Sequence, residues 1–263
     1  MKKEPHSGNA VNVANFESIL GYCIAMGAKY NPTNQMLTIG NLTIKLNLAK
    51  AQMSLVNSTF TDYNKVRNLR KAEYKFLKSL CTRIINALIA CGASDETIAN
   101  ARTINRKIQG GRAKKVVTPV VGKTDVETAV VAPEILANEA IQKSTIEEIK
   151  KISVSQQGFD SNETNFSKLL VLLNTEPLYN PNEEDLTIDA LTIKETALKD
   201  TNSAVKLETP LYTNSLTGRD VVLYESKKGV VDTALLIKAY SLSVLTATNA
   251  DYKKIDHIHF KTF

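Results

Sequence analysis

Apolar residues recur at helical spacing along most of the chain. The first such stretch predicts a helix from about residue 12 to 28, whose apolar face holds Phe16, Ile19, Leu20, Cys23 and Ile24. Asn31-Pro32 follows this stretch, and proline disfavours helical geometry in the residue before it. The helix is therefore expected to end before Asn31.

A second, longer seam has apolar residues in steps that alternate between three and four. Its members are Ile39, Leu42, Leu46, Ala49, Met53, Val56, Phe60 and Tyr63. This spacing predicts a long helix, with Thr38 as its N-cap. The motif LTIxxLTIK within it also alternates apolar and polar residues, so a strand hairpin is the alternative. The continuation at helical spacing favours the helix.

Capping and helix-ending residues in the rest of the chain predict further helices. An apolar face continues from Val66 to Cys91 and stops at Gly92, and Ser94 is placed to cap a last short helix through about Ile108. In the second half, Pro210 fits the first turn of a new helix capped by Thr209. A bend is therefore expected there and near residue 60. A loop at 225–229 then precedes a helix over 230–245.

The chain contains one unit twice. YNPTNQMLTIGNLTIK, residues 30–45, returns as YNPNEEDLTIDALTIK, residues 179–194, with ten of sixteen positions identical. Chance gives about one identity in such a window, so the pattern indicates a duplication. In the second copy, Glu195 and Asn202 replace Leu46 and Met53 in the seam. We expect these two residues to meet solvent or polar partners.

These patterns predict an all-α protein of two helical repeats packed as a bundle about a pseudo-twofold axis, with a short C-terminal extended segment. The predicted divisions are an N-terminal tail over 1–11, repeat 1 over 12–109, a linker over 110–158 and repeat 2 over 159–263. The linker contains one candidate helix over 133–152. Each repeat is too small to bury its apolar stripes alone.

Composition places the protein among ordinary globular chains of 263 residues with 43% hydrophobic content. No secretory signal or membrane span is expected, and three cysteines without a paired spacing indicate reduced thiols in the cytoplasm. Charge is unevenly distributed. Residues 1–115 hold 18 Lys and Arg against 6 Asp and Glu, whereas residues 116–263 hold 15 against 21. This asymmetry favours either a polyanion-binding surface or attraction between the two halves.

Short motifs for metals or cofactors are weak. Gly122-Lys123-Thr124 lacks the earlier glycine of a phosphate-binding loop, because Val117 occupies that position. His257 and His259 lack the further ligands of a structural metal site. We therefore predict no cofactor, no metal and no catalytic residue.

Several polar and aromatic residues occur at equivalent positions of both copies. They are Tyr30 and Tyr179, Asn31 and Asn180, Pro32 and Pro181, Tyr63 and Tyr212, and Arg70 and Arg219. We interpret them as structural residues that hold each unit together. The alternative is a site at the repeat interface around Tyr63 and Tyr212, which would bind an anion or catalyse a reaction.

Basic residues form a stripe in the first repeat. Its members are Arg67, Arg70, Lys71, Lys75, Lys78 and Arg83, followed by Arg106, Lys107, Arg112, Lys114 and Lys115. Such a stripe can bind the phosphates of RNA or DNA. It lacks interleaved exposed aromatic residues, and lysine-rich solvated faces are common on helical proteins.

The chain resembles a family of uncharacterised tandem-repeat helical proteins from Bacteroidota bacteria. The stretches that carry the resemblance are SVSQQGFDSNETNFSKLLVLLNTEPLYNPNEEDLTIDALTIK and VVLYESKKGVVDTALLIKAYSLSVLTATNADYKKIDHIHF, with the RKIQG end of the first copy. His257 and His259 stand where relatives usually have glycine and lysine. The family has no assigned activity, so the resemblance implies the repeat architecture and no chemistry.

The sequence therefore predicts a non-enzymatic structural or protein-interaction module with an unknown protein partner. The alternative is polyanion binding through the basic face of repeat 1 and the basic start of the linker.

Overall fold

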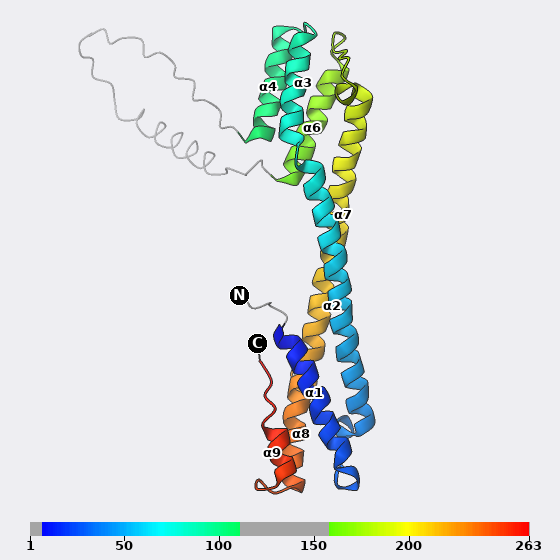
Figure 1. Cartoon of the computed structure of the whole chain (residues 1–263), viewed down its shortest axis with the longest axis vertical. Helices are drawn as coiled ribbons and strands as arrows, with labels where there is room; N and C mark the ends of the chain where they lie inside the picture. The colour runs from blue at the N-terminus through cyan, green and yellow to red at the C-terminus, as the bar shows by residue number, and fades with distance from the viewer. Residues whose placement is uncertain (1–6, 111–157, 263) are drawn as a thin grey trace, which may run out of the picture. The chain divides into compact units, whose positions relative to one another are not determined.

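The computed structural model describes residues 7–110 and 158–262, and within these ranges every regular element is a helix (Figure 1). The predicted all-α class is thereby confirmed. The helices are α1 (Ser7–Ala25), η1 (Gly27–Lys29), η2 (Gln35–Leu37), α2 (Ile39–Tyr74), α3 (Leu77–Ala90), α4 (Asp95–Gln109), α6 (Phe159–Asn174), η3 (Glu184–Leu186), α7 (Ile188–Tyr224), α8 (Val230–Val244) and α9 (Ala250–Asp256). The candidate linker helix over 133–152 and the Gly122-Lys123-Thr124 motif lie outside the described residues.

The first helix differs from its prediction at both ends. It begins at Ser7, within the predicted tail, because the polar residues Asn9 and Asn12 are buried and take part in its packing. It ends at Ala25, because Gly27 adopts a φ of 52° that a right-handed helix does not allow. A short 3-10 turn then leads to Tyr30.

The predicted bend near residue 60 and the new helix at Pro210 are wrong. Both α2 and α7 are continuous, and Pro210 lies inside α7. A proline in a helix interior costs about 3 kcal/mol because it removes a hydrogen bond. The buried seam residues of α7 on either side of Pro210, Leu198, Val205 and Leu223, keep the helix intact.

The caps predicted at Thr38 and Ser94 and the helix end predicted at Gly92 are confirmed, and Thr187 caps α7 as Thr38 caps α2. Thr38 and Thr187 Oγ1 accept hydrogen bonds from the N–H groups of Asn41 and Ala190, at 3.4 and 3.3 Å. Ser94 Oγ accepts from Thr97 N–H at the start of α4, at 3.1 Å. Gly92 follows α3 with a φ of 77°, a left-handed conformation that suits glycine.

The chain divides into two compact units, and each unit takes helices from both sequence repeats. Unit 1 comprises residues 1–70 and 203–263, and unit 2 comprises residues 71–202. The N-terminal half of one repeat therefore packs with the C-terminal half of the other. The repeat boundaries in the sequence do not coincide with the boundaries of the compact units.

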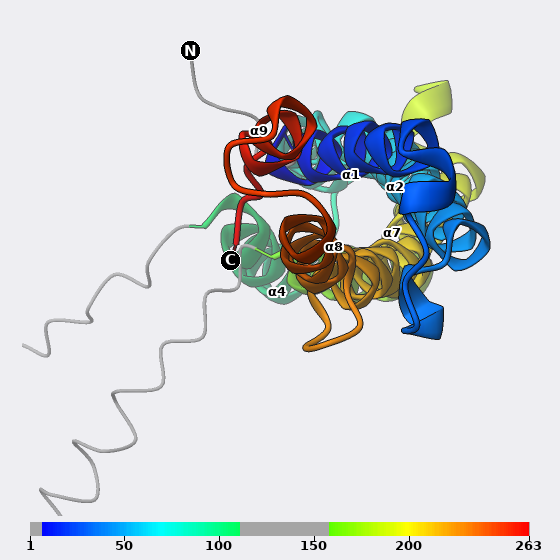
Figure 2. The same cartoon turned by 90° about the horizontal axis from the view of Figure 1, so that it is seen from below.

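Unit 1 has its own apolar core, formed by α1 and α2 from the first repeat and by α7, α8 and α9 from the second. Phe16, Ile19 and Leu42 pack there with Ile237 and Ile255, and all five are fully buried. Seen end-on, α1, α2, α7 and α8 surround this core, and α9 lies against α1 and α8 (Figure 2).

Unit 2 has a second core, formed by α3 and α4 from the first repeat and by α6 and α7 from the second. Leu77, Ile84 and Leu88 of α3 and Ile108 of α4 pack against Phe166 of α6, together with residues of α7. The helix pairs α4–α6 and α3–α4 form its main contacts. The described residues of either repeat supply only a part of each core. This agrees with the expectation that one repeat is too small to bury its apolar stripes alone.

The polar substitutions in the second copy of the seam are satisfied as predicted. Asn202 donates hydrogen bonds to the carboxylates of Asp160 and Glu163, and Glu195 accepts from Ser167 and Lys199. These partners explain how α7 carries polar residues at positions where α2 has leucine and methionine.

Separating the repeats is expected to abolish both cores. We expect residues 1–110 alone and residues 158–263 alone to show weak helicity and no cooperative thermal transition, because each fragment holds one half of each core. Mixing the two fragments is expected to restore a cooperative transition in circular dichroism. Cooperative unfolding of either fragment alone would contradict this packing.

Gly229, the N-cap of α8, is expected to tolerate no side chain. An added Cβ would lie 2.7 Å from the Leu223 carbonyl oxygen and 2.8 Å from the Glu225 nitrogen. We expect Gly229→Ala to lower the free energy of unfolding by about 1–3 kcal/mol. The control is Gly21→Ala inside α1, where nothing lies within 4 Å of the added Cβ and a gain of about 0.5–1 kcal/mol is expected. Urea denaturation measures both, and an unchanged midpoint for Gly229→Ala would refute the clash.

Candidate functional site

Unit 2 has a groove of about 440 Å³ between α3 and the start of α7. It is lined by Phe76, Ser79, Leu80, Arg83, Asp185, Ala190 and Lys194. Phe76 is 67% exposed, an unusual state for a large aromatic side chain. The groove therefore offers an apolar surface with charged groups beside it.

Phe76 owes its exposure to the short connection between two helices. α2 ends at Tyr74 and α3 begins at Leu77, so Lys75 and Phe76 form the whole turn. The ammonium of Lys75 lies 4.9 Å from the centre of the Phe76 ring. A cation over an exposed aromatic face contributes about 0.5–1 kcal/mol and helps fix the ring.

Two ion pairs flank the groove, and each joins the first repeat to the second. The Arg83 guanidinium binds both carboxylate oxygens of Asp185, and Nη2 lies 2.9 Å from Oδ1. Arg83 thereby holds the pKa of Asp185 below its usual value. Lys194 Nζ lies 2.6 Å from a Glu73 carboxylate oxygen and also donates to the Glu73 carbonyl. The two pairs have opposite polarity, because the cation comes from the first repeat in Arg83–Asp185 and from the second repeat in Lys194–Glu73.

Further along the same face of α3 lies a cleft of about 380 Å³. Its lining residues are Ala87, Ala90, Cys91, Leu178, Asn180, Pro181, Asn182 and Glu183. Phe76, Leu80, Arg83, Ala87 and Cys91 follow one another at steps of three or four residues, so the groove and the cleft share one helix face. We name this face, with its groove and its cleft, the α3 surface.

The repeated Tyr-Asn-Pro motif supports the wall of the cleft. The Tyr179 hydroxyl donates to the Leu186 carbonyl at 2.9 Å, and the equivalent Tyr30 hydroxyl donates to the Leu37 carbonyl at 2.9 Å. Both tyrosines are buried, and burial raises the pKa of Tyr179 to about 12. In each unit, the tyrosine of this motif thus ties the turn to a backbone carbonyl seven residues later.

Some of the basic residues proposed for polyanion binding have partners within the chain. Arg83 binds Asp185, Lys78 Nζ donates to the Gln109 carbonyl, and the Arg67 guanidinium lies 5.2 Å from the centre of the Tyr63 ring. Lys71, Lys75, Arg106 and Lys107 are exposed, and Arg70 is half-buried. Arg112, Lys114 and Lys115 lie outside the described residues.

Tyr63 and Tyr212, the equivalent tyrosines of the two repeats, stack on each other in unit 1. Their ring centres are 5.4 Å apart with an interplanar angle of 16°, and Phe60 packs against Tyr212. The pair holds α2 against α7.

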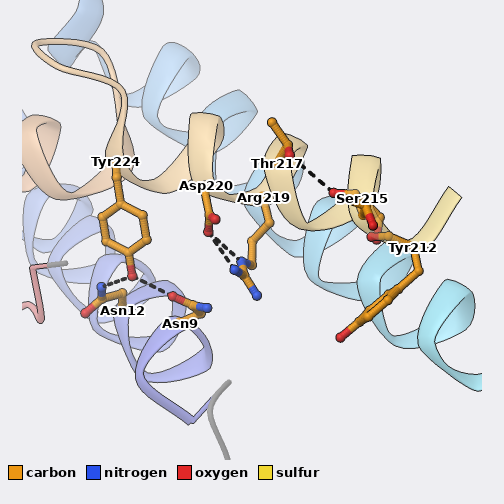
Figure 3. Close-up of polar contacts among 9 residues, drawn as sticks. Asn9, Asn12, Tyr212, Ser215, Thr217, Arg219, Asp220 and Tyr224 are labelled. Carbon is orange, nitrogen blue, oxygen red and sulfur yellow. Dashed lines mark hydrogen bonds and ion pairs between the residues drawn. The ribbon is translucent and has the colours of Figure 1, made fainter. Parts of the chain in front are cut away.

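A buried polar network in unit 1 joins α1, α7 and the C-terminal segment (Figure 3). Arg219 is 8% exposed and donates from Nε and Nη2 to the Asp220 carboxylate, at 2.9 and 2.7 Å. The Asn12 amide donates to the Tyr224 hydroxyl at 3.0 Å and to the Lys261 carbonyl at 2.8 Å. The Asn12 side-chain oxygen in turn accepts from Lys261 N–H at 2.8 Å.

Asn9 completes this network. Its amide faces both Tyr224 and Arg219, and a guanidinium only donates hydrogen bonds. The amide oxygen therefore points to Arg219 Nε and Nη1 at 3.2 and 3.1 Å, and the nitrogen donates to Tyr224 at 2.6 Å. Every group in the network has a protein partner, which is typical of a structural cluster. It fixes the C-terminal segment on α1.

Thiols and imidazoles do not converge in the described part of the chain. Cys23 and Cys81 are buried, and burial raises the pKa of their thiols to about 11 and about 12. Such thiols stay protonated and poorly nucleophilic. Over residues 7–110 and 158–262, no group of three His, Cys, Asp or Glu side chains has a metal-binding arrangement, and this includes His257 and His259.

The buried tyrosines predict how stability depends on pH. An unfolded tyrosine titrates near pH 10, and the pKa of Tyr179 is about 12 in the folded chain and that of Tyr30 is also raised. Their neutral forms stabilise the fold, and this contribution is lost as pH rises from about 10. We expect the double variant Tyr30→Phe, Tyr179→Phe to lose less unfolding free energy above pH 10 than the unaltered protein. At pH 7 its unfolding free energy should be lower by about 1–3 kcal/mol for each backbone carbonyl that loses its hydrogen bond. Urea denaturation at several pH values tests this, and an unchanged dependence of the unfolding free energy on pH would contradict it.

Comparisons with known proteins do not suggest an activity for this site. Searches with the chain found no match among models of protein families, among curated proteins or among solved structures. No helix in the described ranges has the length and apolar content to cross a membrane.

Proposed function

We propose that this protein is a non-enzymatic interaction module that docks a partner protein on the α3 surface of unit 2. The observation that carries the proposal is the exposed Phe76 ring beside an apolar groove of about 440 Å³. Aromatic residues at the centre of protein interfaces often carry most of the binding free energy. Phe76 is the natural anchor for an apolar segment of a partner.

The composition of the groove suits a protein ligand. Phe76, Leu80 and Ala190 supply an apolar centre, and the Arg83–Asp185 and Lys194–Glu73 pairs supply a charged rim. An apolar centre with a polar rim is the usual anatomy of a protein interface. Full burial of one large apolar side chain contributes about 1.5–3 kcal/mol, so one aromatic anchor has a measurable effect.

A cytoplasmic location and membership of the Bacteroidota repeat family belong to the same proposal. The three cysteines are free thiols, and two of them are buried, which suits a reducing compartment. The family resemblance adds no activity to the proposal.

The alternative is binding of RNA or DNA. Lys71 and Lys75 are exposed next to the groove, and Arg106 and Lys107 are exposed at the end of α4, shortly before Arg112. Binding of this kind would weaken steeply with salt, because it releases counterions from the phosphates.

A photo-crosslinker placed at Phe76 separates these functions. We expect p-benzoylphenylalanine at Phe76 to give a discrete protein adduct in cells of the native organism. The same residue at Val171, an exposed apolar position on α6, is expected to give none. Phe76→Ser combined with a crosslinker at Ser79 is expected to lower the adduct yield at least tenfold, because the anchor is lost.

The outcomes are distinct. An adduct that resists nuclease and 1 M salt supports docking of a protein. An adduct to nucleic acid, or recovery that disappears in high salt and after nuclease, would establish the polyanion alternative. Equal adducts from positions 76 and 171 would refute the groove as the docking site.

A further inference from the structure

Unit 1 contains a filled version of the unit 2 cleft. Tyr240 of α8 packs edge-on against Tyr30, with ring centres 5.2 Å apart and an interplanar angle of 88°. Its hydroxyl accepts a hydrogen bond from the backbone N–H of Asn31 at 2.9 Å. One phenol ring thus fills the space between α8 and the Tyr-Asn-Pro motif of this unit.

The helices α3 and α8 correspond residue by residue. Their N-cap residues are Phe76 and Gly229, so positions on α3 map to α8 with an offset of 153. This register pairs buried positions with buried positions: Leu77 with Val230, Cys81 with Ala234, Ile84 with Ile237, and Leu88 with Ser241. Ala87 therefore stands where α8 has Tyr240.

The small side chain of Ala87 leaves the equivalent space of unit 2 open. The cleft of about 380 Å³ lies there, lined by Ala87 on one side and by Asn180 and Pro181 on the other. Asn180 and Pro181 are the counterparts of Asn31 and Pro32. Among the described residues, none accepts a hydrogen bond from the Asn180 N–H, whereas the Asn31 N–H binds Tyr240.

The lining of the cleft specifies its ligand. Ala87, Ala90, Leu178 and Pro181 provide apolar contact for a ring, and the Asn180 N–H provides a donor for a hydroxyl oxygen. The Glu183 carboxylate in the lining repels anions and can accept a hydrogen bond from a neutral hydroxyl. A neutral phenol meets these conditions, and Tyr240 shows the same group bound in the same setting.

The chain itself has no spare tyrosine for this cleft. All nine of its tyrosines lie in the described ranges, and residues 1–6, 111–157 and 263 contain none. We propose that the cleft is a binding site for a tyrosine side chain of a partner protein, which occupies the place that Tyr240 occupies in unit 1. This inference extends the proposed function, because the tyrosine would be a second anchor on the α3 surface beside Phe76.

The experiment uses the full-length protein labelled with ¹⁵N and the probes p-cresol and toluene. p-Cresol is expected to shift the Asn180 amide resonance saturably, with a dissociation constant on the order of 1 mM, as befits a ligand of this size. Toluene, which lacks the hydroxyl, is expected to bind at least fivefold more weakly. No saturable shift at Asn180, or equal binding of toluene, would overturn the proposal.

Two variants provide the structural controls. Ala87→Tyr is expected to fill the cleft and abolish the p-cresol shift at Asn180, whereas Ala87→Ser leaves the cleft open and is expected to keep it. Tyr240→Ala opens the equivalent space in unit 1, and p-cresol is then expected to shift the Asn31 amide as well. This gain tests the proposal even if Ala87→Tyr fails to fold. A p-cresol shift that persists in a folded Ala87→Tyr variant would refute the site.

A last arm distinguishes a partner's tyrosine from a free small phenol. N-acetyl-tyrosine amide is expected to shift Asn180 with an affinity within threefold of p-cresol, and N-acetyl-phenylalanine amide at least fivefold more weakly. Binding of p-cresol without binding of the tyrosine derivative would overturn the partner-tyrosine assignment. The crosslink at Phe76 reports on the proposed function independently, so failure of the cleft and failure of the groove give different results.

Discussion

The packing of this protein depends on one constraint, that neither sequence repeat can bury its apolar stripes alone. The stripes of α1 and of the first part of α2 are covered by α8 and α9, which belong to the other repeat. The stripes of α3 and α4 are covered by α6 and α7 in the same way. The long continuous helices α2 and α7 follow from this exchange, because each carries the chain from one core to the other.

The two units keep one scaffold and differ in how its spaces are filled. Both have a Tyr-Asn-Pro turn anchored by a tyrosine hydroxyl on a backbone carbonyl. In unit 1 a tyrosine from α8 closes the adjoining space, and in unit 2 an alanine of α3 leaves it open. The connection before α3 is also shorter than the loop before α8, and it exposes Phe76. The residues that the two units share hold each unit together, and the residues that differ form the candidate binding surface.

Local features of the fold could be predicted from the sequence because local physics determines them. Thr38, Thr187 and Ser94 cap helices through their own hydroxyls, and Gly92 ends α3 through its backbone freedom. The continuity of α7 through Pro210 was not predictable, because tertiary packing overrides the local cost of a proline. The exchange of halves was not predictable either. Equivalent helices in the two repeats have the same apolar pattern, so the pattern does not say which of two equivalent helices a given stripe packs against.

In the candidate site, too, some features could be predicted from the sequence and others depend on tertiary packing. Arg83 and the Tyr-Asn-Pro motif stand out in the sequence, but their roles depend on residues from the other repeat, such as Asp185 for Arg83. Ala87 carries no sequence signal at all. Its significance appears only when α3 is aligned with α8 through their N-caps, across a connection of different length.

Nuclear Overhauser effects from the Tyr30 ring test the exchange of halves most directly. If α8 packs on the first repeat, Tyr30 ring protons will show cross-peaks to the ring of Tyr240, 5.2 Å away between centres. If each repeat instead packed on itself, Tyr30 would contact the Ala87 methyl group, and Tyr179 would contact Tyr240. Cross-peaks between Tyr30 and Tyr240 are the predicted result, and cross-peaks from Tyr30 to Ala87 would contradict the account.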